Sequence, residues 1–129
     1  MSKLPKNLQL VLSACIVIAM SFVYGAHPSV ILPYIFGFEV QDLELKNIFR
    51  AIMGIYIAFG GYWIYGIINK NHWRSATIVN VLFMGGLAGG RLVSTILDGW
   101  SPQYGAGMIA EAVMMWWGLW NLRFYDENF

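Results

Sequence analysis

The sequence has few charged residues and only one cysteine, and each shortage excludes a class of protein. Charged residues make up 12% of the 129 residues and hydrophobic residues 58%, a balance outside the range of ordinary soluble domains. The net charge of +1 comes without a basic cluster, which excludes a nucleic-acid-binding face. The lone Cys15 excludes an internal disulfide. The composition that remains is typical of a membrane protein.

Four long apolar runs fill most of the chain. Each approaches or reaches the roughly 20 residues that a helix needs to cross the hydrocarbon core of a bilayer. The runs are continuous and do not alternate, so helices are predicted and strands are not. The sequence therefore predicts an all-α fold, with residues 1–129 forming a single integral membrane four-helix bundle. The predicted spans are residues 8–24, 48–68, 76–97 and 105–122.

Basic residues outside the spans predict the orientation of the bundle. Five of them precede the first span, lie between the second and third, or follow the fourth, and these five fall on one side of the membrane. The loop on the opposite side, between the first two spans, holds three acidic residues against Lys46. Positive charge in short loops marks the cytoplasmic side, and both termini are therefore predicted to be cytoplasmic. The residues concerned are Lys3, Lys6, Lys70, Arg74 and Arg123.

The loop between the first two spans, residues 25–47, contains several apolar residues but also helix breakers. Pro28, Pro33 and Gly37 are expected to interrupt regular helix, while the apolar residues lie at the membrane interface. We therefore expect a short re-entrant or surface-lying segment there.

Charge inside the third span is the most informative local feature. In GGLAGGRLVSTILDG, residues 85–99, Arg91 lies six residues before Leu97, or roughly 9 Å below the outer boundary at about 1.5 Å per residue. Glu111 lies six residues after Gly105 in the inward-running fourth span, at the same depth. A lone charge at the bilayer centre costs about 2.5 to 3.5 kcal/mol or more, so an Arg91–Glu111 pair is predicted.

Further polar residues are expected to join this pair in a buried, nearly neutral cluster. Arg50 enters the second span from the same side, and Asp98 ends the third, so contact of Arg50 with Asp98 or Glu111 is geometrically allowed. Helical spacing places the polar residues of the third span, Asn80, Arg91, Ser94 and Asp98, on one face of that helix. It likewise aligns Asn47 and Arg50 at the start of the second span. The candidate ligand-binding residues are Asn47, Arg50, Asn80, Arg91, Ser94, Asp98 and Glu111.

Small residues predict where helices approach one another. Gly85 with Gly89, and Gly86 with Gly90, form two overlapping pairs of small residues spaced four apart, a pattern that allows close helix contact in membranes. Gly54 aligns with Arg50 on the second span. These five glycines are the predicted helix-packing positions.

Three segments together resemble a known family: NIFRAIMG at 47–54, GGLAGGRLVSTILDGWSP at 85–102, and Glu111. They are similar to a widespread family of small bacterial membrane proteins with a domain of unknown function, related to the DoxX-like four-helix proteins. The resemblance implies a bacterial inner-membrane four-helix bundle, and relatives in the DoxX-like group imply an association with redox complexes and quinones. It marks as the shared polar core Arg50, Gly54, Gly90, Arg91, Ser94, Asp98, Gly99 and Glu111.

Two functions remain open. In the first, the polar cluster binds a lipid-like or quinone-like ligand; in the second, the protein is an accessory subunit of a larger membrane complex, or a homo-oligomer, and the cluster is purely structural. No nucleophile is recognisably paired with a base and no cofactor motif is present, which favours a non-catalytic protein. His27 and His72 fall on opposite sides of the membrane, which disfavours a shared metal site.

Overall fold

The computed structural model describes residues 3–125, and these residues form helices with no strand among them, as the all-α prediction requires. Four of the five α-helices are long and one is short. A single 3-10 turn lies between the third and fourth α-helices of the chain. In chain order the elements are α1 (Lys3–Gly25), α2 (Pro28–Phe36), α3 (Leu43–Ile68), η1 (Lys70–His72), α4 (Trp73–Asp98) and α5 (Pro102–Tyr125).

Three segments are long and apolar enough to cross a membrane: Lys6–Gly25, Leu43–Ile68 and Lys70–Asp98. They contain the first three predicted spans, which supports the prediction of a membrane protein. The fourth predicted span lies in α5, a helix of 24 residues that is not among the three candidates, so the sequence-based count of four spans is not confirmed.

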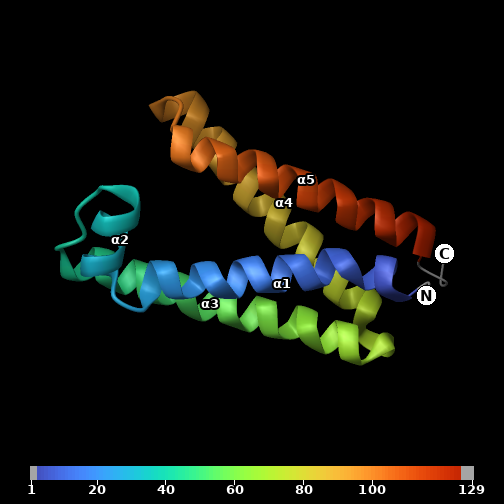
Figure 1. Cartoon of the computed structure of the whole chain (residues 1–129). Coiled ribbons are helices and arrows are strands. Elements are labelled where there is room, and N and C mark those ends of the chain that lie inside the picture. Colours follow the sequence, from blue (N-terminus) through green and yellow to red (C-terminus); the bar gives the residue numbers. More distant parts are fainter. Residues whose placement is uncertain (1–2, 126–129) are drawn as a thin grey trace.

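The long helices pack as two antiparallel pairs. α1 packs along α3, and α4 packs along α5, while contacts between the pairs are much sparser. Figure 1 shows that the pairs meet near the end of the molecule where α1 begins and α5 ends, and diverge toward the end where α2 lies. The divergence leaves room between the pairs at the α2 end, which we call the outer end; the opposite end is the inner end.

Close packing within the pairs depends mostly on glycines outside the two overlapping small-residue pairs. A Cβ at Gly60 of α3 would lie 2.6 Å from Ile18 Cγ1 of α1, and one at Gly118 of α5 would lie 2.6 Å from Val81 Cγ2 of α4. Only a hydrogen atom fits at such positions. Glycine at these sites therefore sets the distance between the paired helices.

Of the five glycines predicted to pack helices, only Gly85 does so within the described chain. A Cβ there would lie 2.9 Å from Met115 Sδ, whereas a Cβ at any of the other four would meet nothing within 4 Å. The prediction was wrong for these four because the spacing of small residues does not specify which helix face the neighbour covers. They are Gly54, Gly86, Gly89 and Gly90.

A polar contact joins the two pairs near the inner end. Gln9 Nε2 of α1 donates to Asn80 Oδ1 of α4 at 2.7 Å and to the Met114 carbonyl of α5 at 2.9 Å. Gln9 and Asn80 are fully buried, where an unpaired amide would be destabilising. Asn80 therefore holds the pairs together at this end and does not belong to a cluster around Arg91, contrary to the prediction.

The segment after α1 is a short helix in place of the irregular segment expected. Pro28 occupies its first turn, where the missing N–H would have no helical partner in any case. Pro33 lies inside the helix, and Leu32 beside it is fully buried. Only Gly37 ends the helix, at φ +80°, where its N–H donates to the Leu32 and Pro33 carbonyls. The prediction that both prolines break the helix was wrong.

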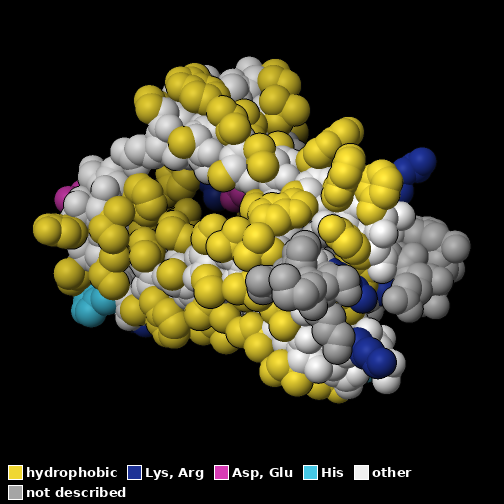
Figure 2. All heavy atoms as spheres, turned by 45° about the vertical axis from the view of Figure 1, so that its right-hand side comes forward, with side chains coloured by type: hydrophobic (Ala, Val, Ile, Leu, Met, Phe, Trp, Pro, Cys, Tyr) yellow, Lys and Arg dark blue, Asp and Glu magenta, His cyan; other side chains and the backbone are white. Residues whose placement is uncertain are grey.

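Most of the basic residues outside the spans gather at the inner end. This end contains the start of α1, the turn between α3 and α4, and the end of α5 (Figure 1). Most of the basic side chains in Figure 2 lie there. Lys6 Nζ lies 4.4 Å from the centre of the Trp73 ring, and Trp73 Nε1 donates to the Lys6 carbonyl at 3.3 Å. These contacts attach the start of α1 to the start of α4.

Candidate functional site

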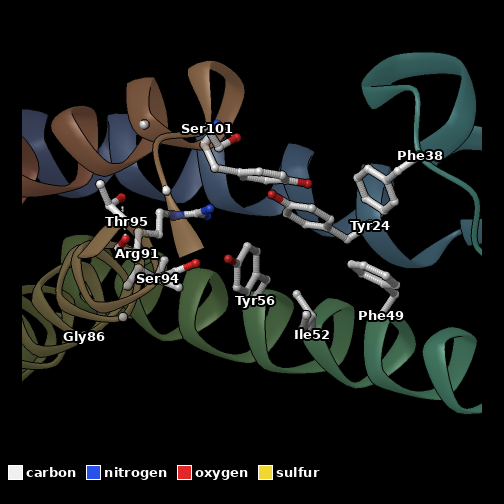
Figure 3. Close-up of a pocket in the computed structure, with 15 residues that line it drawn as sticks. Tyr24, Phe38, Phe49, Ile52, Tyr56, Gly86, Arg91, Ser94, Thr95 and Ser101 are labelled. Carbon is white, nitrogen blue, oxygen red and sulfur yellow. Dashed lines mark hydrogen bonds between the residues drawn. The ribbon is translucent and has the colours of Figure 1, made fainter. Parts of the chain in front are cut away.

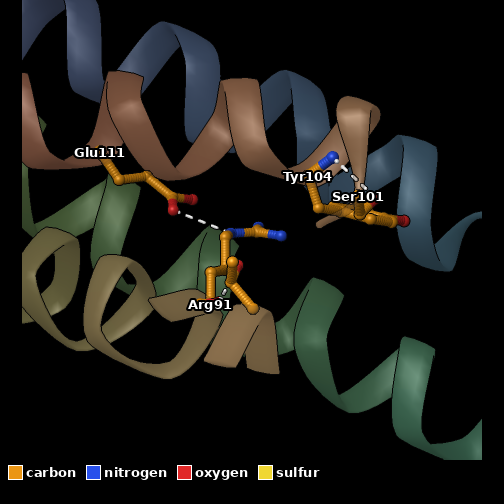
Figure 4. Close-up of polar contacts among 5 residues, drawn as sticks. Arg91, Ser101, Tyr104 and Glu111 are labelled. Atoms are coloured by element: carbon orange, nitrogen blue, oxygen red, sulfur yellow. Dashed lines mark hydrogen bonds and ion pairs between the residues drawn. The ribbon is translucent and has the colours of Figure 1, made fainter. Parts of the chain in front are cut away.

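An ion pair links α4 to α5 where the two helix pairs diverge. Arg91 Nε donates to Glu111 Oε1 at 2.8 Å, which confirms the predicted partnership (Figure 4). The side chains of Arg91 and Glu111 are 22% and 14% exposed, respectively. No charged side chain within residues 6–125 is buried, so the expected buried cluster of four charges is reduced to one partly exposed pair.

Local sequence positions the groups on either side of the arginine. The Arg91 carbonyl accepts a hydrogen bond from Thr95 Oγ1 at 2.8 Å, which ties the two residues one turn apart. Ser101 precedes α5, and its Oγ accepts from the Tyr104 N–H at 3.3 Å, with Pro102 at the first helical position. This start of α5 places the Tyr104 ring 5.0 Å from the Arg91 guanidinium carbon, within cation–π range.

A cavity of about 520 Å³ opens beside Arg91. Its walls are mainly apolar and aromatic, and they come from both helix pairs and the turn between α4 and α5. Figure 3 shows the phenol oxygens of Tyr24 and Tyr56 pointing toward the part of the cavity where the Arg91 guanidinium lies. The walls include Tyr24, Phe38, Phe49, Ile52, Tyr56, Gly86, Gly90, Arg91, Ser94 and Tyr104.

A second cavity of about 230 Å³ adjoins the first on the side of α1 and α5. Glu111 lines this second cavity, together with Met20, Ala110 and Met114. Figure 2 shows a hollow in the surface with basic and acidic atoms at its floor. The walls that the two cavities share are Tyr24, Tyr56, Leu87, Arg91 and Tyr104.

Stacked aromatic rings close the outer side of these cavities. Tyr24 stacks with Phe36 and with Phe49, at centroid distances of 6.1 Å and 5.9 Å. Phe36 also contacts Tyr104 at 5.3 Å, and Gln103 Nε2 of α5 donates to the Phe36 carbonyl at 3.1 Å. The end of α2 is thereby connected to the start of α5 across the gap between the helix pairs.

Several predicted site residues lie away from the cavities. Arg50 Nη1 donates to the carbonyls of Gly25 and Ala26, each at 2.9 Å. Arg50 therefore provides hydrogen-bond donors for carbonyls at the end of α1, the helix that pairs with its own helix α3. It does not pair with Asp98 or Glu111, which belong to the other helix pair. Asp98 is exposed and accepts from Ser94 Oγ at 3.1 Å.

Of the seven candidate ligand-binding residues, three line a cavity and four do not. Arg91 and Ser94 line the first, and Arg91 and Glu111 line the second. Asn47 is exposed. Neither cavity is lined by Asn47, Arg50, Asn80 or Asp98.

Tyrosines in the wall were missed in the sequence. Tyr24, Tyr56 and Tyr104 come from three different helices and converge only because the helix pairs diverge around them. The available signal was a tyrosine in an apolar run: Tyr24 lies at the end of the first run and Tyr56 lies inside the second. A buried phenol usually finds a polar partner, so both tyrosines pointed to a polar contact.

The assembled groups suit an oxygen-bearing head group with an apolar body. An arginine carries five N–H donors, and the contact with Glu111 engages the Nε–H. Because Glu111 balances the arginine charge, the site favours neutral or weakly charged acceptor oxygens over a multiply charged anion. Within the described residues, no three His, Cys, Asp or Glu side chains lie close enough to hold a metal ion.

Comparison with known proteins identifies the family of the chain. The model of a family described as a domain of unknown function, DUF4345, matches residues 6–122, which include every cavity residue named above. No curated protein and no solved structure matches the chain.

Proposed function

We propose that the chain binds a lipid-like or quinone-like molecule between its two helix pairs. The chain belongs to the DUF4345 family, which is described as a domain of unknown function. The observation that carries the proposal is the cavity of about 520 Å³ whose aromatic walls contain one arginine. Ligand sites are mostly apolar cavities of roughly 300 to 1,000 Å³ with a few polar groups that orient the ligand. The proposed role is binding without a chemical step.

In the proposed complex, the head group accepts hydrogen bonds from the Arg91 guanidinium and from the hydroxyls of Tyr24 and Tyr56. Ser94 lines the same cavity. The stacked Tyr24 and Phe49 rings offer flat apolar faces to a ring or to the start of a chain. Glu111 holds Arg91 from the opposite side.

Binding is expected to depend on the Arg91–Glu111 pair. The double variant Arg91→Met/Glu111→Gln removes the guanidinium without leaving an unpaired charge. Loss of a charged hydrogen bond is expected to weaken binding by at least about tenfold. The measurement is the affinity of the purified full chain for decylubiquinone and for phosphatidylglycerol, so that the two head groups are compared directly.

Arg50→Met is the matched control, because Arg50 is exposed and lines neither cavity, and its hydrogen bonds described above go to the carbonyls of Gly25 and Ala26. It is expected to bind both probes as the wild type does. If the double variant stays folded and keeps wild-type affinity for whichever probe binds, or if neither probe binds the wild type, the ligand-binding proposal is wrong.

We also propose that α5 is a fourth membrane span, which makes the chain a multi-pass protein of the bacterial inner membrane with both termini cytoplasmic. The length of α5, 24 residues, corresponds to about 36 Å of helix, and α5 packs along α4. The same four long helices support a relationship to DoxX-like proteins.

The proposed orientation predicts the behaviour of reporter fusions. A fluorescent protein that matures only in the cytoplasm, fused after Phe129, is expected to be bright, because the basic residues of the inner end favour the cytoplasm. Alkaline phosphatase fused after Trp100, in the turn between α4 and α5, is expected to be active. An active phosphatase at Phe129 would contradict the four-span topology.

The alternative function, an accessory subunit, is favoured by a separate surface. An exposed groove on α5, lined by Val113, Trp116, Trp117 and Trp120, provides apolar and aromatic area for another membrane protein. A larger subunit that is retained in stoichiometric amount by the wild type, and lost on Trp116→Ala, would favour this alternative in native mass spectrometry.

A further inference from the structure

We infer that the bound molecule carries a long apolar chain, and that this chain leaves the cavity between α3 and α4, past Gly86 and Gly90, into the bilayer. The inference rests on the proposed function and adds two properties to it: the ligand class, a chain-bearing amphiphile, and its route of entry, sideways from the membrane.

The first observation is the shape of the larger cavity. Its walls on this side are Phe49 and Ile52 of α3 and Gly86 and Gly90 of α4. A Cβ at either glycine would meet nothing within 4 Å, and both glycines are exposed. The cavity therefore reaches the outer surface of the helices at a position where neither glycine contributes a side chain that would obstruct it.

The second observation is depth. Gly86 lies five residues before Arg91 on α4, or roughly 7.5 Å farther from the outer end. It lies at the middle of the predicted span 76–97, where a membrane consists of acyl chains. A molecule with its head at Arg91 and its tail at Gly86 would pass from polar to apolar surroundings, as an amphiphile requires.

The other sides of the two cavities carry side chains and polar contacts. The outer side is crossed by the Gln103–Phe36 hydrogen bond and by the Phe36–Tyr104 ring contact. The side between α1 and α5 leads from the smaller cavity, of about 230 Å³, whose walls include the long side chains of Met20 and Met114. The α3–α4 side combines the larger cavity with two wall positions, Gly86 and Gly90, that carry no side chain.

The test introduces leucine at the proposed exit. Gly86→Leu places a side chain in the opening, and its Cβ meets no neighbour. Gly89→Leu is the matched control, because Gly89 is also exposed, also has open space at its Cβ, and lines neither cavity. Ala110→Leu adds the same bulk at the wall of the second cavity.

The probes are a benzoquinone and a phosphatidylglycerol, each with a photoreactive diazirine in the part of its chain next to the head group. They are added to the purified full chain. Mass spectrometry locates the labelled peptides. We expect label on α3 and α4 around Ile52 and Gly86, and a loss of about tenfold in Gly86→Leu, equivalent to roughly two methylene groups losing their contacts. Gly89→Leu and Ala110→Leu are expected to label as the wild type does.

The outcomes separate the inference from the function on which it rests. If Arg91→Met/Glu111→Gln abolishes labelling but Gly86→Leu does not, or if Ala110→Leu abolishes it instead, the route between α3 and α4 is wrong and the binding site stands. If label spreads evenly over the exposed faces of all long helices, and neither Gly86→Leu nor the double variant changes it, both the route and the binding site are wrong.

Discussion

Arg91→Met is expected to lower the free energy of unfolding by about 2 to 3 kcal/mol, because it leaves Glu111 without its partner. Removing one member of a fully buried ion pair typically destabilises by roughly 3 to 5 kcal/mol. The smaller figure applies because both side chains retain some exposure to the cavities. The measurement is equilibrium unfolding of the purified protein in a mild detergent.

The double variant Arg91→Met/Glu111→Gln provides the control for this prediction. It removes both charges at once and leaves no unpaired carboxylate, so it is expected to be more stable than Arg91→Met alone by about 1 to 3 kcal/mol. Equal stabilities for the single and double variants would show that the Arg91–Glu111 contact does not stabilise the fold.

Gly66→Ala is expected to destabilise the protein by about 1 to 3 kcal/mol, through overpacking between α3 and α4. The added Cβ would overlap that of Ala76 and lie 3.2 Å from the His72 carbonyl oxygen. Ala76 is fully buried and its methyl group has no rotamer that moves it away, so the backbones must separate. Thermal unfolding in detergent measures the effect.

Gly61→Ala is the matched control, five residues earlier on the same helix. A Cβ at Gly61 would meet nothing within 4 Å, so alanine there is expected to stabilise the helix by up to about 1 kcal/mol through its higher helix propensity. If both variants changed stability equally, the close approach of α3 to α4 at Gly66 would be contradicted.

The depth of the charged groups was predictable because helix rise is constant. Arg91 and Glu111 lie the same number of residues from the same membrane boundary, and a charge in an apolar span needs a partner. Counting along the chain was therefore sufficient to pair them. The depth of Arg50 could also be predicted, but its hydrogen-bond partners could not. Two carbonyls at the end of α1 lie within its reach and bind it in place of the carboxylates.

The helix-packing glycines show the limit of pattern. Gly60 and Gly86 are both small residues in apolar helices, yet a Cβ at Gly60 would lie 2.6 Å from Ile18 and one at Gly86 would meet no neighbour. Which glycine approaches a neighbour depends on how each helix is rotated against its partner, and that rotation results from packing over the whole interface.

By itself the sequence determined that the chain is helical, that at least three segments are apolar enough to span a membrane, and that Arg91 lies level with Glu111. These follow from local hydrophobicity and from fixed helix geometry. Tertiary structure alone decided that the long helices form two diverging pairs, and that Tyr24, Tyr56 and Tyr104 therefore surround a cavity at Arg91. Convergence of side chains from separate helices depends on crossing angles and close contacts, which no local pattern encodes.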